Sequence, residues 1–346
     1  MALDRDLGVA VLRAYAERTG RPLRGWEMLA ATGVRGLRLV NESAAFSELW
    51  LTEIQPPALE VLEGNARRFT DAGARVRRWD AAEPLPGGPF DYVDVDPFGT
   101  PVPFLGAAFA ALADGGLLAV TATDMPVLAG VQADACEQRY GARPVRGRLG
   151  PEGGLRILLA WLARGAASRD RSIHSLLAYV HDHHVRCYVT VASPAGPAPL
   201  ATVTNSGLPF PVLPGPGPYG PMWVGPLLDA PFVRRLSVPH GAEHARELSG
   251  WLARFREESE VDVPFYFEPN TIARALGLPR PPPLEALIQG LRARGFRAGR
   301  SPVRPSAFRT DAPRAVLEEV ARAAVPAGIG GTGPARPTGP TPSGGS

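Results

Sequence analysis

The sequence predicts an α/β protein with a doubly wound, mostly parallel sheet, followed by a smaller, mostly helical α+β region. Two observations lead to this prediction. Short apolar runs typical of strands alternate with segments of helical periodicity over the first half of the chain. Several of the expected strands end at an acidic residue, and open α/β sheets bind ligands at the carboxyl ends of their strands. With 346 residues, the chain is long enough for about two domains.

The first elements follow from periodicity and turn residues. Residues 4–19 carry apolar side chains at helical spacing, which indicates an amphipathic helix. Residues 25–30 are a short apolar run and are expected to form the first strand. The two glycines of Thr32-Gly33-Val34-Arg35-Gly36 predict a tight turn into a helix that reaches about Asn41.

Three further strands are expected to end at a carboxylate. They are residues 49–52 before Glu53, residues 75–79 before Asp80, and residues 90–95 before Asp96. Apolar segments of helical length lie between and after them, and a fifth apolar run follows. These are helices expected at 57–69 and 103–112 and a strand expected at 116–123.

The rest of the chain is less regular. A helix at 154–167 precedes a hairpin of 175–179 and 185–191, and residues 220–225 are expected to return a strand to the first domain. Residues 192–220 are rich in Pro and Gly. Later helices are expected near 242–258, 270–276 and 284–294. From residue 326 the chain is almost all Gly, Pro, Ser, Thr and Ala, which cannot bury a core and predicts disorder.

Composition narrows the class of protein. Hydrophobic content of 45% and charged content of 21% are ordinary for a globular protein. No apolar run is long enough to span a membrane, so a cytoplasmic protein is expected. Cys136 and Cys187 lie far apart, which argues against a disulfide framework and a zinc ribbon. All 37 basic residues are Arg, which suits a nucleic-acid partner but also follows from a GC-rich genome.

The tetrapeptide Asp96-Pro97-Phe98-Gly99 is the most informative motif. At the end of a buried strand, the carboxylate can accept a hydrogen bond from the exocyclic amine of a nucleobase. Pro97 lacks a competing N–H, and the Phe98 ring can stack on the flat base. An ordinary strand-end turn with an acidic cap is the alternative interpretation.

The preceding strand ends indicate a cofactor pocket. The Gly33 turn is not the GxGxxG of a nicotinamide enzyme, but it places free N–H groups near a helix start. Glu53 follows about 20 residues later, where an acid typically holds a ribose, and Asp80 is placed to reach an adenine. Each acid alone could simply cap a helix. Together with Asp96, the order is typical of the Rossmann-like sheet of a class I S-adenosylmethionine methyltransferase.

These segments together resemble the tRNA (guanine-N2)-dimethyltransferase family, from Ala2 to about Ala323. The resemblance is carried by Leu3-Asp4-Arg5-Asp6-Leu7, Ala31-Thr32-Gly33-Val34-Arg35-Gly36, Asp94-Val95-Asp96-Pro97-Phe98-Gly99-Thr100-Pro101, Val120-Thr121-Ala122-Thr123-Asp124, Leu155-Arg156-Ile157-Leu158, Asp182-His183-His184-Val185-Arg186, Tyr219-Gly220-Pro221-Met222-Trp223-Val224-Gly225-Pro226-Leu227 and Arg309-Thr310-Asp311-Ala312-Pro313.

The resemblance implies S-adenosylmethionine as cofactor, tRNA as partner, and Asp96 as the catalytic residue that serves a guanine amine, usually at position 26. The implied cofactor contacts are Arg5, Arg35, Glu53, Asp80 and Ala81. It implies a cofactor-binding catalytic domain at 1–228, a tRNA-binding domain at 229–323 and a disordered tail at 324–346. The chain departs from the family where it begins almost on the Arg5 motif, without the aromatic segment usual before it, and where Glu53 replaces the usual Asp.

Two further sets of residues could have a function. His181, His183 and His184 could suggest a metal site, but adjacent strand residues face opposite sides, and a polar hairpin turn is the preferred interpretation, with no metal expected. A basic C-terminal stretch is expected to bind tRNA phosphates, its main residues being Arg297, Arg300, Arg304 and Arg309. A solvated helix face is the alternative there.

Two other functions stay open on the sequence alone. One is an amino-methyltransferase acting on rRNA or DNA, since similar tetrapeptides serve adenine and cytosine. The other is an RNA-binding member without catalysis. No membrane contact and no obligate protein partner are expected.

Overall fold

A mostly parallel sheet forms the centre of the larger part of the molecule. The computed structural model describes residues 2–69, 73–204, 213–214, 217–261 and 263–325. Within them, the main sheet has seven strands, which are, in spatial order, β3 (Ala74–Arg78), β2 (Phe46–Glu53), β1 (Leu23–Glu27), β4 (Phe90–Val95), β5 (Leu112–Ala122), β7 (His184–Ala192) and β6 (Ser172–His181). The five strands from β3 to β5 pair in parallel, and β6 and β7 add an antiparallel hairpin.

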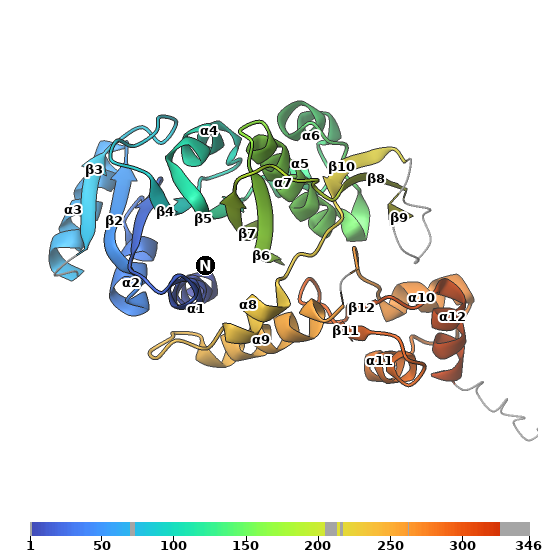
Figure 1. Cartoon of the computed structure of the whole chain (residues 1–346). Coiled ribbons are helices and arrows are strands. Elements are labelled where there is room, and N and C mark those ends of the chain that lie inside the picture. The colour runs from blue at the N-terminus through green and yellow to red at the C-terminus, as the bar shows by residue number, and fades with distance from the viewer. Residues whose placement is uncertain (1, 70–72, 205–212, 215–216, 262, 326–346) are drawn as a thin grey trace, which may run out of the picture.

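Helices cover both faces of this sheet. Figure 1 shows α4 and α7 on one face and α1 on the other. The helices of this part are α1 (Ala2–Thr19), α2 (Val34–Ser43), α3 (Pro56–Phe69), α4 (Val102–Ala111), α5 (Met125–Leu128), α6 (Ala133–Tyr140), the 3-10 turn η1 (Gly147–Leu149) and α7 (Gly150–Ala167). The doubly wound α/β fold that the sequence predicts is therefore confirmed. Helices cover β4 from both sides, and all six of its residues are buried, including Asp91 and Asp94.

The segment expected to return a strand to the main sheet lies elsewhere. β10 (Tyr219–Trp223) pairs with β8 (Leu200–Thr204), which in turn pairs with β9 (Leu213–Pro214), in a separate small sheet. β10 packs against α7 instead of extending the main sheet. The main sheet already closes on the β6–β7 hairpin, so its edge next to β5 is occupied.

The C-terminal part is mostly helical, as predicted. It contains α8 (Ala230–Arg235), α9 (Ala245–Ser259), α10 (Pro269–Leu276), α11 (Leu284–Arg292), β11 (Ala298–Arg300), β12 (Phe308–Thr310) and α12 (Arg314–Ala323). Local chemistry sets several of the helix ends. Asp229 Oδ1 accepts a hydrogen bond from Phe232 N at 2.7 Å and caps α8, while Gly277, with φ of 62°, ends α10.

The apolar clusters do not divide at residues 228–229. α8 and α9 contribute Phe232, Trp251 and Phe255 to the large core of the main sheet, which extends to Phe265. A second, smaller cluster begins at Phe267 and is built by α10, α11, β12 and α12. The expected disordered tail lies outside the described residues from 326 onward. Among the helices of the described residues, none combines the length and apolar character needed to cross a lipid bilayer.

Candidate active site at the carboxyl edge of the sheet

The three strand-end carboxylates predicted from the sequence lie at one edge of the sheet. Glu53 is the last residue of β2, Asp80 follows β3 by two residues, and Asp96 directly follows β4. Because β3, β2, β1 and β4 are neighbours that run in parallel, their carboxyl ends meet at the same edge. Ligands of open α/β folds bind at this edge.

Glu53 holds the turn that precedes α2. Its Oε2 accepts a hydrogen bond from Ala31 N at 3.1 Å, and its Oε1 accepts from Ile54 N and Gln55 N, both at 2.8 Å. The turn itself requires glycine, because Gly33 has φ of 79° and a Cβ there would lie 2.4 Å from Leu62 Cδ1. The carboxylate is therefore fixed in place, and its remaining lone pairs can accept further hydrogen bonds.

Arg35 and Asp96 form the central pair of the site. Arg35 lies in the first turn of α2, is buried, and donates from Nη2 to Asp96 Oδ2 at 2.5 Å. Burial alone would raise the pKa of the Asp96 carboxyl, but the guanidinium groups of Arg35 and Arg186 outweigh it and hold that pKa below its ordinary value. Asp96 is therefore an ionised hydrogen-bond acceptor at neutral pH.

A buried network supports this pair from inside the sheet. Arg186 of β7 donates to both carboxylate oxygens of Asp94, at 3.1 and 2.8 Å, and to Thr121 Oγ1 at 2.6 Å. Tyr92 donates to Asp94 Oδ2 at 2.7 Å. Sequence reasoning did not single out these residues as part of the site. Two features of the sequence could have indicated them: Asp94 lies within a strand expected to be buried, and Arg186 lies in a predicted hairpin. Buried charges of opposite sign are expected to pair.

Glu27 adds a second buried acid next to this network. It ends β1 opposite Asp94, and burial, together with the Asp94 charge, raises its pKa to about 8. Its Oε2 has no hydrogen-bond partner among the described residues, and neither does Arg35 Nη1. Gly36 permits the close approach, because a Cβ there would lie 2.1 Å from Glu27 Oε2. One carboxyl oxygen and one guanidinium nitrogen thus stay buried here without a partner among the described residues.

The loop after β4 presents an aromatic ring to solvent. Phe98 is fully exposed, whereas Pro97 beside it is buried. The loop is fixed at its far end, because Gly99 N donates to Thr123 Oγ1 at 2.6 Å and Thr123 N donates to Gly99 O at 2.9 Å. An exposed ring on an anchored loop, two residues after Asp96, could stack on a flat base.

The remaining expected cofactor contacts lie around this edge. Arg5 lies in the first turn of α1 and has a buried Nε without a partner among the described residues. Asp80 is exposed and accepts at Oδ1 from Ala82 N at 2.9 Å, and Ala81 between them is buried. Arg5 thus offers a hydrogen-bond donor and Asp80 an acceptor. Their individual roles remain predictions.

The four C-terminal Arg residues differ in their surroundings. Arg297, Arg300 and Arg304 are half-exposed and pair with Asp311, Glu285 and Glu268 respectively. Arg309 is buried between Glu152 and Glu258, at 2.9 and 3.0 Å. A phosphate could not reach Arg309 without breaking these pairs, so its burial does not fit the expectation that it binds tRNA.

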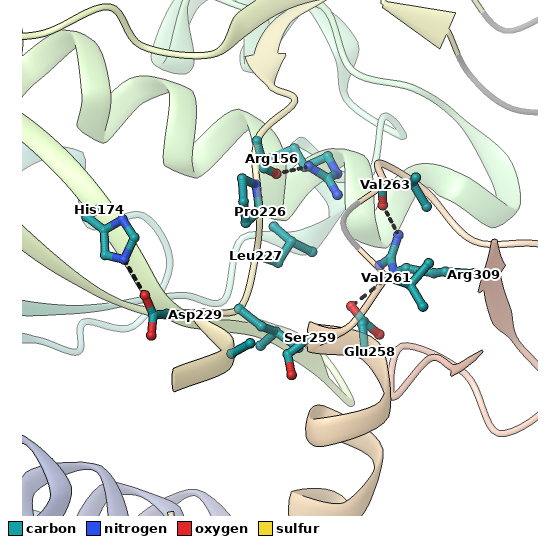
Figure 2. A pocket seen from close by; sticks show the side chains of 13 residues that line it. Arg156, His174, Pro226, Leu227, Asp229, Glu258, Ser259, Val261, Val263 and Arg309 are labelled. Atoms are coloured by element: carbon teal, nitrogen blue, oxygen red, sulfur yellow. Dashed lines mark hydrogen bonds and ion pairs between the residues drawn. The ribbon is translucent and has the colours of Figure 1, made fainter. Parts of the chain in front are cut away.

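Arg309 also lines a cavity of about 240 Å³ between α7, β6 and α9, drawn in Figure 2. Among the residues that the sequence predicts as site residues, Arg309 is the one that lines this cavity. Arg156 and Glu258 lie there as well, and His174 Nε2 is 2.7 Å from Asp229 Oδ2. The cavity belongs to the junction with the C-terminal part and is separate from the edge that carries Asp96.

Comparison with known proteins assigns the family. The sequence model of the N2,N2-dimethylguanosine tRNA methyltransferase family matches residues 1–204 and 216–322. The chain belongs to this family. A tRNA (guanine(26)-N(2))-dimethyltransferase of Thermococcus kodakarensis is 37% identical over 92% of this chain and 91% of its own length. One from Pyrococcus horikoshii is 32% identical over 92% of this chain and 90% of its own length.

A solved structure agrees over nearly the whole chain. Trm1 from Pyrococcus horikoshii, in complex with S-adenosyl-L-methionine, superimposes with a TM-score of 0.83 at 30% identity, covering 92% of each chain. The family and the fold class predicted from the sequence are therefore confirmed. This family is one of enzymes, which also agrees with the prediction.

Proposed function

We propose that this chain transfers methyl groups from S-adenosylmethionine to the exocyclic N2 amine of a guanine in tRNA, at position 26. The observation that carries the proposal is the placement of Asp96-Pro97-Phe98-Gly99. An ionised acceptor and, two residues later, an exposed ring follow the carboxyl end of β4, in a member of a family whose named relatives modify this amine.

The pocket residues fit the cofactor in charge and position. Arg35, with one unpaired buried nitrogen, and Arg5 suit its carboxylate, and Glu53 suits the two ribose hydroxyls. Asp80 and Ala81 lie at the end of β3, where the adenine would bind. When bound, the cofactor supplies an electrophilic methyl group on a sulfonium.

Asp96 and Phe98 prepare the base. The guanine amine is a poor nucleophile because its lone pair is delocalised into the ring, so positioning and charge stabilisation must supply the catalysis. Asp96 accepts a hydrogen bond from the amine N–H and orients its nitrogen, while Phe98 stacks on the base. The lowered pKa of Asp96 keeps the carboxylate ionised, so it can stabilise positive charge that develops on the nitrogen. A methylated amine still carries one N–H, which allows a second transfer.

The half-exposed Arg297, Arg300 and Arg304 are proposed to hold tRNA phosphates. Asp311 and Glu285, the partners of Arg297 and Arg300, are partly or well exposed, so a phosphate can compete for these two guanidinium groups. Glu268, the partner of Arg304, is buried, but its Oε1 lies 3.7 Å from Arg304 Nε. We propose a cytoplasmic location, which suits a tRNA substrate.

The test is a methylation assay on an unmodified tRNA transcript with guanine at position 26, read by mass spectrometry of its nucleosides. We expect N2-methylguanosine, N2,N2-dimethylguanosine, or both, and no product from a matched transcript with adenine at position 26. Product on the adenine transcript would refute the position. Methylation of rRNA or DNA but not of tRNA would refute tRNA as the substrate. No methylated product on any of these nucleic acids would favour a family member without catalytic activity.

A further inference from the structure

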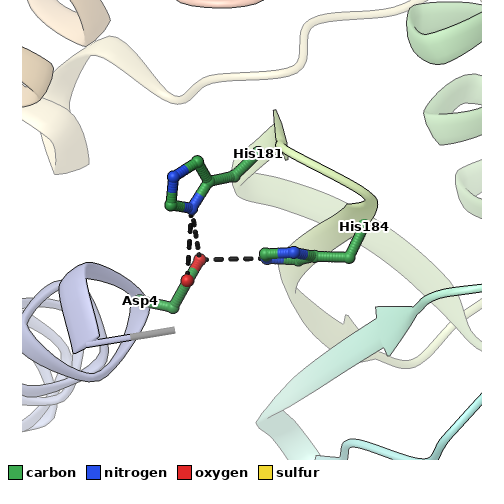
Figure 3. Close-up of side chains that lie close together, drawn as sticks. All are labelled: Asp4, His181 and His184. Carbon is green, nitrogen blue, oxygen red and sulfur yellow. Dashed lines mark hydrogen bonds and ion pairs between the residues drawn. The ribbon is translucent and has the colours of Figure 1, made fainter.

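Three side chains from distant parts of the chain meet beside the start of α1. The Asp4 carboxylate lies between two imidazoles, with His184 Nε2 3.0 Å from its Oδ1 and His181 Nδ1 3.2 Å from each of its oxygens (Figure 3). Asp4 comes from α1, and both His residues come from the β6–β7 hairpin, about 180 residues later.

The hairpin fixes the two imidazoles on one face. His181 and His184 are directly paired residues of β6 and β7, so their side chains project to the same side of the sheet. Their ring centroids are 5.5 Å apart. The turn is made by Asp182, with φ of 47°, and His183, which is exposed. The sequence argument about opposite strand faces does not apply to His183, which lies in the turn, and it missed the cross-strand pair of His181 with His184 and the distant Asp4.

The spacing of these atoms suits a shared metal ion. One ligand atom from each residue lies within 4.8 Å of the other two, and this is the one such cluster found among the described residues. The edge of a tetrahedron with arms of about 2.0 Å, the length of a zinc–nitrogen or zinc–oxygen bond, is about 3.3 Å. The observed 3.0 and 3.2 Å separations need little change to reach it.

Neighbouring groups hold the ligands in orientation. Tyr179 donates to Asp4 Oδ1 at 3.0 Å, and the Trp251 ring of α9 packs edge-on against His181, with centroids 4.9 Å apart. Asp4 and His184 are buried, while His181 is 13% exposed, which leaves a path for an ion and for a water ligand. Such outer contacts are usual around metal-ligating His and Asp.

We propose that Asp4, His181 and His184 bind one divalent transition-metal ion of the zinc class, with a fourth position for water. Two imidazoles and one carboxylate are a ligand set that Zn²⁺ and Co²⁺ accept. The ion joins the first turn of α1 to the β6–β7 hairpin. Arg5 follows Asp4 directly, so the ion also fixes the start of the segment that carries this proposed cofactor contact. Metal binding itself does not rest on the proposed function.

The test is Co²⁺ and Zn²⁺ binding to the full chain, prepared without a polyhistidine tag and freed of metal with a chelator. We expect one equivalent of Co²⁺ to give visible absorption bands typical of four or five ligands, and Zn²⁺ to displace it and raise the melting temperature. His183→Gln is the matched control, because it changes an exposed neighbour in the same turn. It should bind as the wild type does.

His181→Gln removes a partly exposed ligand and should weaken Co²⁺ binding by about 100-fold or more. Asp4→Asn should do the same, and circular dichroism of both variants verifies that they fold. The proposal is overturned if the wild type takes up no ion, or if folded His181→Gln binds Co²⁺ as tightly as the wild type. In either case the cluster is a hydrogen-bonded His–Asp–His group only. The binding assay involves no methyl transfer, so its failure would leave the proposed function untouched.

Discussion

Arg309 and Glu152 form a buried, two-fold hydrogen-bonded ion pair that joins β12 to α7. Arg309 Nη1 and Nη2 donate to the two carboxylate oxygens of Glu152 at 3.0 and 2.9 Å, and both side chains are almost wholly buried. Arg309 Nε also lies 3.0 Å from Glu258 Oε1 of α9. One guanidinium therefore links three elements across the junction between the main sheet and the C-terminal part.

Removing this guanidinium should destabilise the protein strongly. Arg309→Gln leaves buried carboxylates without their main partner, which typically costs about 3–5 kcal/mol in the free energy of unfolding. Arg234→Gln is the control, because Arg234 also pairs with a Glu near the end of α9, at 2.7 Å, but in solvent. It should cost at most about 1 kcal/mol. Urea denaturation of both variants measures the two losses of stability. Equal losses would show that the buried ion pair stabilises the protein no more than the exposed one does.

The ion pair of Arg309 with Glu152 is a feature that could not be predicted from the sequence. Glu152 lies 157 residues away from Arg309, and nothing local distinguishes Arg309 from the half-exposed Arg300 or Arg304. Asp96 was different. An acid directly after a short strand of an α/β sheet lies at its ligand-binding edge, whatever the tertiary details. The sequence could therefore predict which strand ends converge, but not which buried charges pair behind them.

The same limit explains the other differences. The pairing of β10 with β8 depends on strands in a Pro- and Gly-rich stretch that carries little periodicity. The Asp4, His181 and His184 cluster requires the hairpin register and the placement of α1, both set by tertiary packing. Local patterns specify the elements and their order, whereas long-range contacts specify their partners.

Asp96→Asn should impair methyl transfer far more than cofactor binding. The amide keeps an oxygen that can accept from Arg35 but loses the negative charge that faces the amine. Loss of such an electrostatic contact typically lowers the rate by about 100-fold or more. Single-turnover methylation of tRNA measures the rate, and calorimetry with S-adenosylhomocysteine measures the affinity. A rate within about twofold of wild type would remove Asp96 from the catalytic role.

Glu53→Ala should weaken cofactor binding. The variant loses the proposed ribose acceptor and also releases Ala31 N, so the turn before α2 loosens. Loss of a charged acceptor costs roughly 1.5–3 kcal/mol, about 10- to 100-fold in affinity for S-adenosylhomocysteine. Glu48→Ala is the control on the same strand, since Glu48 pairs with Arg24 and Arg75 away from the edge. Equal affinities of both variants would place the ribose elsewhere.

Glu27 should make stability depend on pH in a defined direction. Its folded-state pKa of about 8 lies above the ordinary value of 4.5, so between these values the folded state holds a proton that the unfolded state releases. Stability from this group is therefore present at low pH and lost as pH rises toward 8. The Glu27→Gln side chain has nearly the same shape as a protonated Glu but has no proton to release. Its stability relative to wild type should rise with pH between about 5 and 8, by at most about 1.4 kcal/mol per unit. A constant difference over this range would mean that Glu27 is ionised in the folded protein.

The proposed tRNA contacts of the C-terminal part should appear in the salt dependence of binding. Figure 1 shows α3 and the C-terminal helices at opposite ends of the molecule, so Arg67 and Arg68 of α3 provide a matched control. Each phosphate contact contributes about 0.7–0.9 to the slope of log affinity against log salt, because it releases a counterion. A variant with Arg300→Gln and Arg304→Gln should therefore bind tRNA more weakly and with a flatter slope.

The Arg67→Gln and Arg68→Gln variant removes the same formal charge and should leave the slope unchanged, while cofactor affinity should be equal in both. Arg300 and Arg304 pair with Glu285 and Glu268 in the protein, so a phosphate must displace these carboxylates before it can contribute. If the C-terminal variant kept the wild-type slope, the local carboxylates would hold both guanidinium groups in the complex. The tRNA would then be bound by another surface.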